Sequence, residues 1–186
     1  MFEQVVIKAS DREASERFYA TVLGALSDEL TERDEDVAEW SDFCVAQADD
    51  PAGVTRGLHI GFSAASRNEV DAFWRAGLEA GYRDDGPPSP RPRYSADYYG
   101  AFLLDPDGNS AEAVHHGGLR RGGTIDHLWV RVADVAAARR SYEAVAARAG
   151  LELVHDQPDN IRLSNGNGSF TIVAGTPTEN ADVTFL

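Results

Sequence analysis

One template recurs three times in this chain: a short apolar strand, a residue suited to start a helix, and an amphipathic helix. The three copies open at Gln4, His59 and His127. Each helix carries large aromatic side chains at matching points, namely Phe18 and Tyr19, Phe73 and Trp74, and Tyr142. A repeat of this kind predicts modules of similar fold within one chain.

Each expected helix has a start signal, a stop signal and strands after it. The side chains of Asp11, Ser66 and Asp134 can accept from free N–H groups of the first turn. Gly24, Gly81 and Gly150 stand where a helix C-cap favours glycine. Residues 39–46, the hairpin around 105–109, and segments 161–163 and 170–173 read as the strands that close the three units. Each unit is therefore predicted to be a strand, a helix and two or three further strands.

The repeat also predicts the domain organisation. Residues 178–185 can be laid over residues 55–62 as a fourth opening, but no helix follows it. Residues 116–123 contain four glycines and are typical of a linker. We expect a two-module domain over residues 1–118, a linker over 119–123, and a third, unpaired module over 124–186.

Two polar side chains stand out on the expected strands of the second unit. Asp105-Pro106-Asp107-Gly108-Asn109 predicts a tight turn, because Pro106 fixes its φ angle and Gly108 tolerates positive φ. Glu112 follows in the middle of the next strand, and His59 lies in the first strand of the same unit. A carboxylate on a sheet face needs water or a cation beside it. We therefore expect His59 and Glu112 to converge on one site.

Composition excludes several kinds of partner. The formal net charge of −14 argues against a nucleic-acid surface, which needs clustered Lys and Arg. No apolar run approaches the roughly 20 residues of a membrane span. The first residues do not resemble a signal peptide, and the single cysteine, Cys44, agrees with a reducing compartment. We expect a cytoplasmic protein with no nucleic-acid partner and no membrane partner.

The repeated units, the opening at residues 126–143 and the segment LLDPDGNSAEAVHH together resemble the vicinal oxygen chelate superfamily. This family includes glyoxalase I, bleomycin-resistance proteins and extradiol dioxygenases. The resemblance implies an α+β fold of repeated βαβββ modules, two of them paired into a curved mixed sheet with a concave cleft, plus a third module. It also implies metal ligands on the first and last strands of each module.

Carried over by position, the resemblance assigns metal-ligating roles to Gln4, His59 and Glu112. The last-strand position of the first module offers only Cys44 or Val45, so one acid is missing there. The third module keeps His127 but presents Ile172 where an acid would stand, which argues against a metal in that module.

Imidazole and carboxylate ligands suit one divalent ion such as Fe²⁺, Mn²⁺, Ni²⁺ or Zn²⁺. The alternative is that His59 and Glu112 hydrogen-bond each other or a buried water and hold no ion. Both interpretations remain open at this point.

A proline-rich segment, residues 86–99, is expected to form a stiff loop over the cleft. Its cations and phenols predict a ligand-binding role for Arg91, Arg93, Tyr94 and Tyr98, toward an anionic or aromatic small molecule. The alternative is a surface loop whose tyrosines pack on the edge of the sheet.

Two classes of function follow. The first is a metal-dependent lyase, isomerase or dioxygenase acting on a vicinal-oxygen substrate, with Glu112 as the catalytic residue that exchanges a proton. The second is a metal-free protein that binds or sequesters a small molecule or drug. An unpaired third module would also favour a homodimer, because it buries too little surface alone.

Overall fold

A computed structural model describes residues 1–146 and 148–185 of the chain. The first module contains β1 (Phe2–Ala9), α1 (Arg12–Gly24), β2 (Glu32–Arg33), β3 (Val37–Trp40) and β4 (Phe43–Gln47), followed by the short 3₁₀ helix η1 (Pro51–Gly53). The second contains β5 (His59–Ser63), α2 (Arg67–Glu79), β6 (Arg83–Pro90), β7 (Tyr99–Leu104) and β8 (Ser110–His115). The third contains β9 (Ile125–Val132), α3 (Val135–Ala146), β10 (Glu152–Gln157), β11 (Asn160–Ser164) and β12 (Ser169–Ala174), and β13 (Asp182–Phe185) follows it. The repeated strand and helix order is confirmed.

The helices begin where the sequence predicts. Asp11, Ser66 and Asp134 accept from the backbone N–H groups three residues later, at 2.9, 3.3 and 2.9 Å. Gly81 and Gly150 follow their helices with positive φ, as a glycine stop requires, whereas Gly24 is the last residue of α1 itself. No helix in the described part of the chain is long and apolar enough to cross a membrane.

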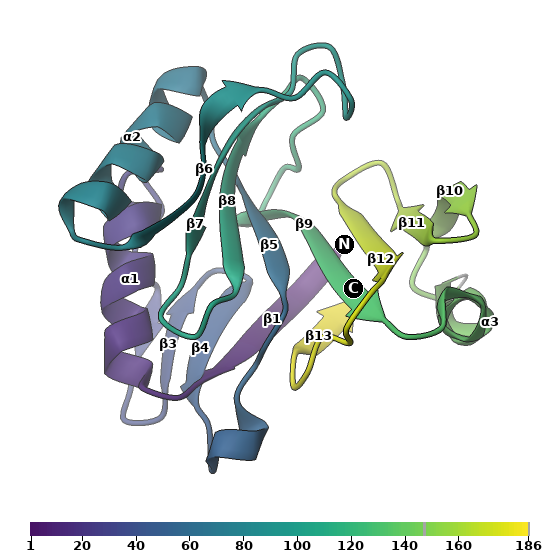
Figure 1. Cartoon of the computed structure of the whole chain (residues 1–186), viewed down its shortest axis with the longest axis horizontal. Coiled ribbons are helices and arrows are strands. Elements are labelled where there is room, and N and C mark those ends of the chain that lie inside the picture. Colours follow the sequence, from purple (N-terminus) through teal and green to yellow (C-terminus); the bar gives the residue numbers. More distant parts are fainter. Residues whose placement is uncertain (147, 186) are drawn as a thin grey trace.

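The strands form two sheets (Figure 1). An eight-stranded sheet has the order β10-β11-β12-β9-β5-β8-β7-β6, so it is built from the second and third modules. Its two halves meet where β5 and β9 pair antiparallel. A five-stranded sheet has the order β13-β1-β4-β3-β2, so β13 completes the edge of the first module. The expected α+β fold, with two modules paired in a mixed sheet, is confirmed.

The choice of paired modules differs from the expectation. Residues 124–186 are not an unpaired module, because β9 lies against β5 and β13 lies against β1. The edge of β5 that the first module was expected to cover is occupied by β9. Because β9 and β13 are already paired within the chain, an unpaired module no longer favours a homodimer. Dimer formation stays a prediction that sedimentation can test.

The first module joins the second through side chains. Tyr19 of α1 packs on Phe43 of β4, with ring centroids 4.6 Å apart, and Phe43 packs on Phe62 of β5 at 5.2 Å. In Figure 1, α1 and α2 lie side by side at one end of the molecule and α3 lies at the other, next to β10 and β11. All three modules thus share one continuous hydrophobic core.

The predicted turn at residues 105–109 is present, and it fixes the start of β8. Asp105 Oδ1 accepts from the N–H groups of Asp107 and Asn109, at 2.9 and 2.8 Å. Gly108 has a φ of 87°. The Tyr19 hydroxyl donates to Asp105 Oδ2 at 3.1 Å. The turn is thereby anchored to the first module, and the register of the strand that carries Glu112 is set.

Arg120, in the segment expected to be a linker, forms a buried ion pair with the first module. Arg120 is 6% exposed and pairs with Asp42, which is 5% exposed. The other guanidinium nitrogen of Arg120 donates to the carbonyl oxygen of Phe2 at 2.9 Å. Asp42 Oδ1 accepts from the N–H of Thr124 at 2.8 Å. This pair joins the five-stranded sheet to the start of β9.

We expect Asp28→Asn to stabilise the protein near pH 7. Burial, followed by the nearby charges of Asp42 and Glu69, raises the pKa of Asp28 to about 6. A carboxyl group with a raised pKa in the folded state favours folding fully below its unfolded pKa of about 4, and this contribution is lost as the pH rises through about 6. Since Asp28 is partly exposed, the variant should gain about 1 kcal/mol at pH 7.

Urea unfolding of the variant and the wild type at pH 4 and pH 7 measures this difference. The gain should shrink toward pH 4, where residue 28 of the folded protein is largely uncharged in both the variant and the wild type. An equal gain at both pH values would contradict the electrostatic explanation.

Candidate metal centre

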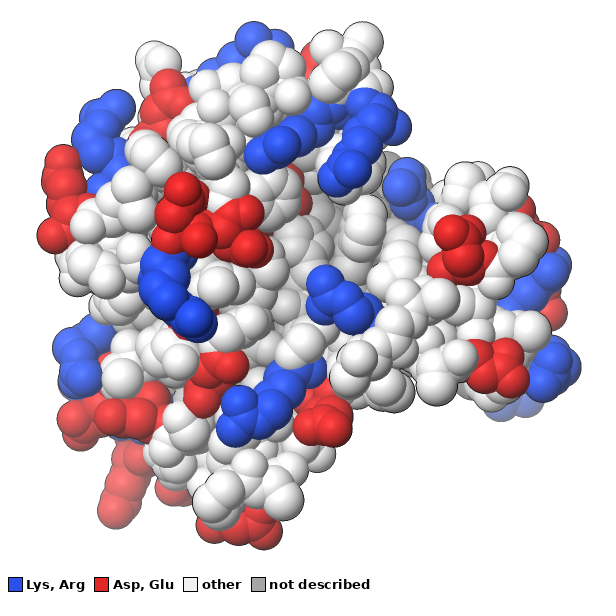
Figure 2. All heavy atoms as spheres, in the orientation of Figure 1, with Lys and Arg blue, Asp and Glu red and all other residues white. Residues whose placement is uncertain are grey.

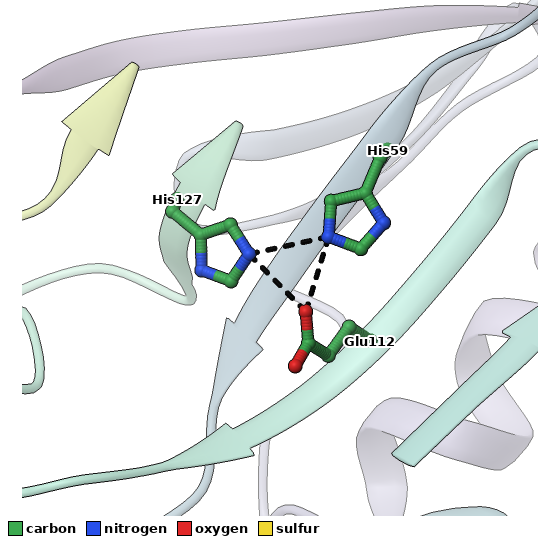
Figure 3. Close-up of side chains that lie close together, drawn as sticks. All are labelled: His59, Glu112 and His127. Atoms are coloured by element: carbon green, nitrogen blue, oxygen red, sulfur yellow. Dashed lines mark hydrogen bonds and ion pairs between the residues drawn. The ribbon is translucent and has the colours of Figure 1, made fainter. Parts of the chain in front are cut away.

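Three donor atoms from three strands meet on one face of the eight-stranded sheet (Figure 3). His59 Nε2 on β5 lies 3.0 Å from Glu112 Oε2 on β8. His127 Nε2 on β9 lies 3.2 Å from Glu112 Oε2 and 3.2 Å from His59 Nε2. His59 is partly buried, while Glu112 and His127 are 1% and 4% exposed. The three side chains can therefore hold one ion.

The middle strand of this site makes room for the other two ligands. Gly61 of β5 is the Cα partner of Glu112 on one side and of His127 on the other. A Cβ atom on Gly61 would overlap the His127 ring, and one on Gly100 would overlap Glu112 Oε1. These two glycines leave the volume that the ligand side chains fill.

We expect Gly61→Ala to weaken metal binding about tenfold, because the added methyl group displaces the His127 ring from the other two donors. Calorimetric titration with Ni²⁺ measures the affinity, and circular dichroism checks the fold. Gly24→Ala is the matched control, since a Cβ atom there meets no atom within 4 Å. Unchanged affinity in Gly61→Ala would show that His127 is not a ligand.

A second contact orients each candidate ligand. His127 Nδ1 lies 3.0 Å from Asp126 Oδ2, and His59 Nδ1 lies 3.2 Å from Ser110 Oγ. The Tyr98 hydroxyl donates to Glu112 Oε1 at 2.9 Å. Contacts of this kind fix the ring and carboxylate orientations that metal ligands need.

The charges of the cluster favour a cation. Burial acts to raise the pKa of Glu112, but hydrogen bonds from His127 and His59 outweigh it and hold the pKa at about 2. Burial acts to lower the pKa of His127, but Asp126 and Glu112 raise it to about 9. Burial lowers the pKa of His59. Without an ion, one imidazolium lies between two carboxylates, and a divalent ion can take the place of its proton.

The donor triangle fits a divalent transition metal. The three donor atoms lie 3.0 to 3.2 Å from one another, so one ion could contact all of them. Two imidazoles and one carboxylate are ligands that suit a divalent transition metal.

Among the residues assigned from sequence, Gln4 does not join this cluster. It lies on β1 in the five-stranded sheet, where its Nε2 donates to Glu39 Oε2 at 3.3 Å. The reason is topological, because β1 pairs with β4 and β13 rather than with β5. His59 and Glu112 are brought together, as expected.

The sequence did not predict His127 as a metal ligand. Its position nevertheless indicated this role, since His127 opens the third repeat as His59 opens the second. By strand register, the position equivalent to Glu112 is Thr171 rather than Ile172, because Thr171 pairs with Trp129 as Glu112 pairs with Gly61. The missing acid of the third module does not prevent a site that takes two of its ligands from the second module.

The proline-rich segment starts as an edge strand rather than a loop. Among the described strands β6 pairs only with β7, and its register is irregular, which lets prolines lie on its outer side. Tyr94 and Tyr98 then line two cavities, of about 260 and 280 Å³; His127 lines the first, and His59 and Glu112 line the second. Arg91 and Arg93 line the cavity of about 280 Å³. The expected binding residues thus lie near the cluster.

Comparisons with known proteins agree with this fold. The sequence model of the Glyoxalase/Bleomycin resistance protein/Dioxygenase superfamily matches residues 2–113. A glyoxalase/bleomycin resistance protein from Albidiferax ferrireducens is 30% identical, with a TM-score of 0.57, over 62% of this chain and 99% of that chain. Glyoxalase I from Zea mays is 17% identical, with a TM-score of 0.65, over 98% of this chain and 71% of that chain.

A glyoxalase-related enzyme from Fulvimarina pelagi is 16% identical, with a TM-score of 0.52, over 64% of this chain and 92% of that chain. A search among curated proteins finds no match. The second and third of these structural likenesses show the fold alone, whereas the family match covers more than half of the sequence. The chain belongs to the glyoxalase/bleomycin resistance protein/dioxygenase superfamily.

Proposed function

We propose that this protein is a divalent-metal-dependent enzyme that acts on a small molecule with two vicinal oxygen atoms. The observation that carries the proposal is the triangle of His59, Glu112 and His127, whose members line two cavities. Superfamily membership makes a lyase, an isomerase or a dioxygenase the expected classes. The ion is Fe²⁺, Mn²⁺, Ni²⁺ or Zn²⁺, the ions that imidazole and carboxylate ligands suit.

The residues of the site have separate tasks in this proposal. A bound ion supplies Lewis acidity to the oxygen atoms of the substrate. His59 and His127 hold the ion. Glu112 offers it one oxygen and is the catalytic residue that exchanges a proton with the substrate. Tyr98 keeps Glu112 in place through the other carboxylate oxygen, at 2.9 Å.

The walls of the cavities bind the rest of the substrate. Tyr94 and Trp129 meet edge to face, with centroids 5.8 Å apart, and both line the two cavities. Arg91 and Arg93 add positive charge. A cytoplasmic location and a homodimer remain part of the proposal, on the grounds of the single cysteine and the open strand edges of β2 and β13.

Metal analysis of protein purified without chelator tests the proposal. We expect close to one equivalent of a transition metal per chain, and recovery of that stoichiometry after removal and readdition of the ion. Protein that neither retains nor rebinds any of the four ions would refute it.

One observation favours a second function, metal-free binding of a small molecule. The donors already satisfy one another, since His127 pairs with both Glu112 and Asp126. A hydrogen-bonded cluster of this kind is complete without an ion. In that case ligands should bind the cavities with the same affinity in the presence and absence of EDTA.

A further inference from the structure

The cavity lined by His59 and Glu112 concentrates positive charge in a strongly acidic chain. Its volume is about 280 Å³, and Arg91, Arg93 and Arg131 line it together with His59 and Glu112. The chain as a whole carries a net charge of −14. Figure 2 shows Lys and Arg side chains on both sides of the hollow beside β9. Three guanidinium groups at one cavity therefore contrast with the remaining surface.

These guanidinium groups are held by neutral partners. Arg131 donates to the carbonyl oxygen of Gly57 at 2.6 Å, and Arg93 donates to the Tyr94 hydroxyl at 2.6 Å. Arg91 donates to the carbonyl oxygen of Pro87 at 3.4 Å, and its buried Nε has no hydrogen-bond partner among the described residues. Within residues 1–146 and 148–185, none of the three forms an ion pair with a carboxylate. Their charge is free to act on a ligand.

Two acids also line the cavity, and both have other partners. Asp85 accepts from the Ser110 hydroxyl at 2.7 Å. Glu112 is bound by Tyr98 and the two histidines. The cavity therefore presents more positive than negative charge to a ligand, before any metal ion is counted.

The cationic end and the metal end are joined by aromatic walls. His127, Trp129 and Arg131 share one face of β9, since side chains alternate along a strand. Their spacing places the Cα atoms of His127 and Arg131 about 13 Å apart. On the other wall, the Arg91 guanidinium lies 5.0 Å from the centre of the Phe102 ring. Arg91 and Arg131 line the same cavity as His59 and Glu112, so one ligand in this cavity can contact both ends.

We propose that the substrate carries an oxyanion, a carboxylate or a phosphonate or phosphate group, which Arg91 and Arg131 bind while its other end reaches the metal cluster. Only the part of this inference that concerns the metal end rests on the proposed function. Guanidinium groups bind planar or tetrahedral oxyanions through paired N–H donors. Arg93 adds long-range attraction.

Titration of the metal-free protein with benzoate, phenylphosphonate and the neutral analogue benzamide tests the anion site by itself. We expect at least one of the two anions to bind about tenfold more tightly than benzamide. Arg131→Gln and Arg91→Gln should each remove most of that preference and leave benzamide binding unchanged. Arg75→Gln, an exposed arginine on α2, is the matched control.

The two anions distinguish the sources of the oxyanion. Binding of benzoate supports a carboxylate, and binding of phenylphosphonate alone supports a phosphonate or phosphate. Equal affinity for benzamide and both anions, or a preference that survives both substitutions, would overturn the inference. Because no metal is present, failure of the metal proposal leaves this result intact.

The metal-loaded protein then links the two ends. 3,4-Dihydroxybenzoate, which has both vicinal oxygens and a carboxylate, should bind more tightly than either benzoate or 3,4-dihydroxybenzamide. Affinity no higher than that of benzoate would show that the cationic cavity is separate from the metal end, and the inference about the substrate would be wrong.

Discussion

Glu112→Gln is expected to lower the affinity of the metal centre for Ni²⁺ or Zn²⁺ by about 100-fold or more. Glu112 is the one carboxylate in the donor triangle and is 1% exposed. A glutamine keeps the shape but removes the negative charge that offsets the cost of burying a cation. His127→Ala should cause a loss of similar size, because it removes one of the three donors. Calorimetric titration with each ion measures both affinities.

Two control variants make this test specific. His155→Ala changes an exposed histidine on β10 and should leave the affinity unchanged. Gln4→Ala should also leave it unchanged, because Gln4 contacts Glu39 in the other sheet. Weaker binding in Gln4→Ala, together with normal binding in His127→Ala, would show that the site pairs the first and second modules and would contradict the arrangement described above.

Asp42→Ala is expected to lower the free energy of unfolding by about 3 to 5 kcal/mol. The substitution leaves the buried Arg120 guanidinium without its counter-ion, and it leaves the N–H of Thr124 without its acceptor. Removing one member of a buried pair is costly because the other charge stays desolvated. Urea unfolding, followed by tryptophan fluorescence and circular dichroism, measures the loss.

An exposed ion pair provides the comparison. Asp182 lies 3.1 Å from Lys8, with side chains 62% and 39% exposed, and Asp182→Ala should cost less than about 1 kcal/mol. The double variant Asp42→Leu with Arg120→Met should recover much of the stability lost in Asp42→Ala, because no buried charge remains. A loss in Asp42→Ala no larger than that in Asp182→Ala would mean that the pair does not hold the sheets together.

The sequence by itself determined the local structure of this protein. Helix starts at Asp11, Ser66 and Asp134, and the turn around Gly108, depend on neighbouring residues and were readable from spacing. The repeated template, with the resemblance built on it, gave the βαβββ module. It also gave the meeting of His59 and Glu112, because both belong to one module whose strands pair within a short stretch of chain.

Only the tertiary structure decided which modules pair. Each module offers a similar first strand, so β5 has two chemically similar candidates for its free edge, and sequence periodicity does not distinguish them. The choice depends on contacts between distant segments, such as Asp42 with Arg120 and β1 with β13. A metal centre built across two modules takes its ligands from the strands that lie side by side in the sheet. Because β9 lies beside β5, His127 belongs to the site, whereas Gln4 lies in the other sheet and contacts Glu39.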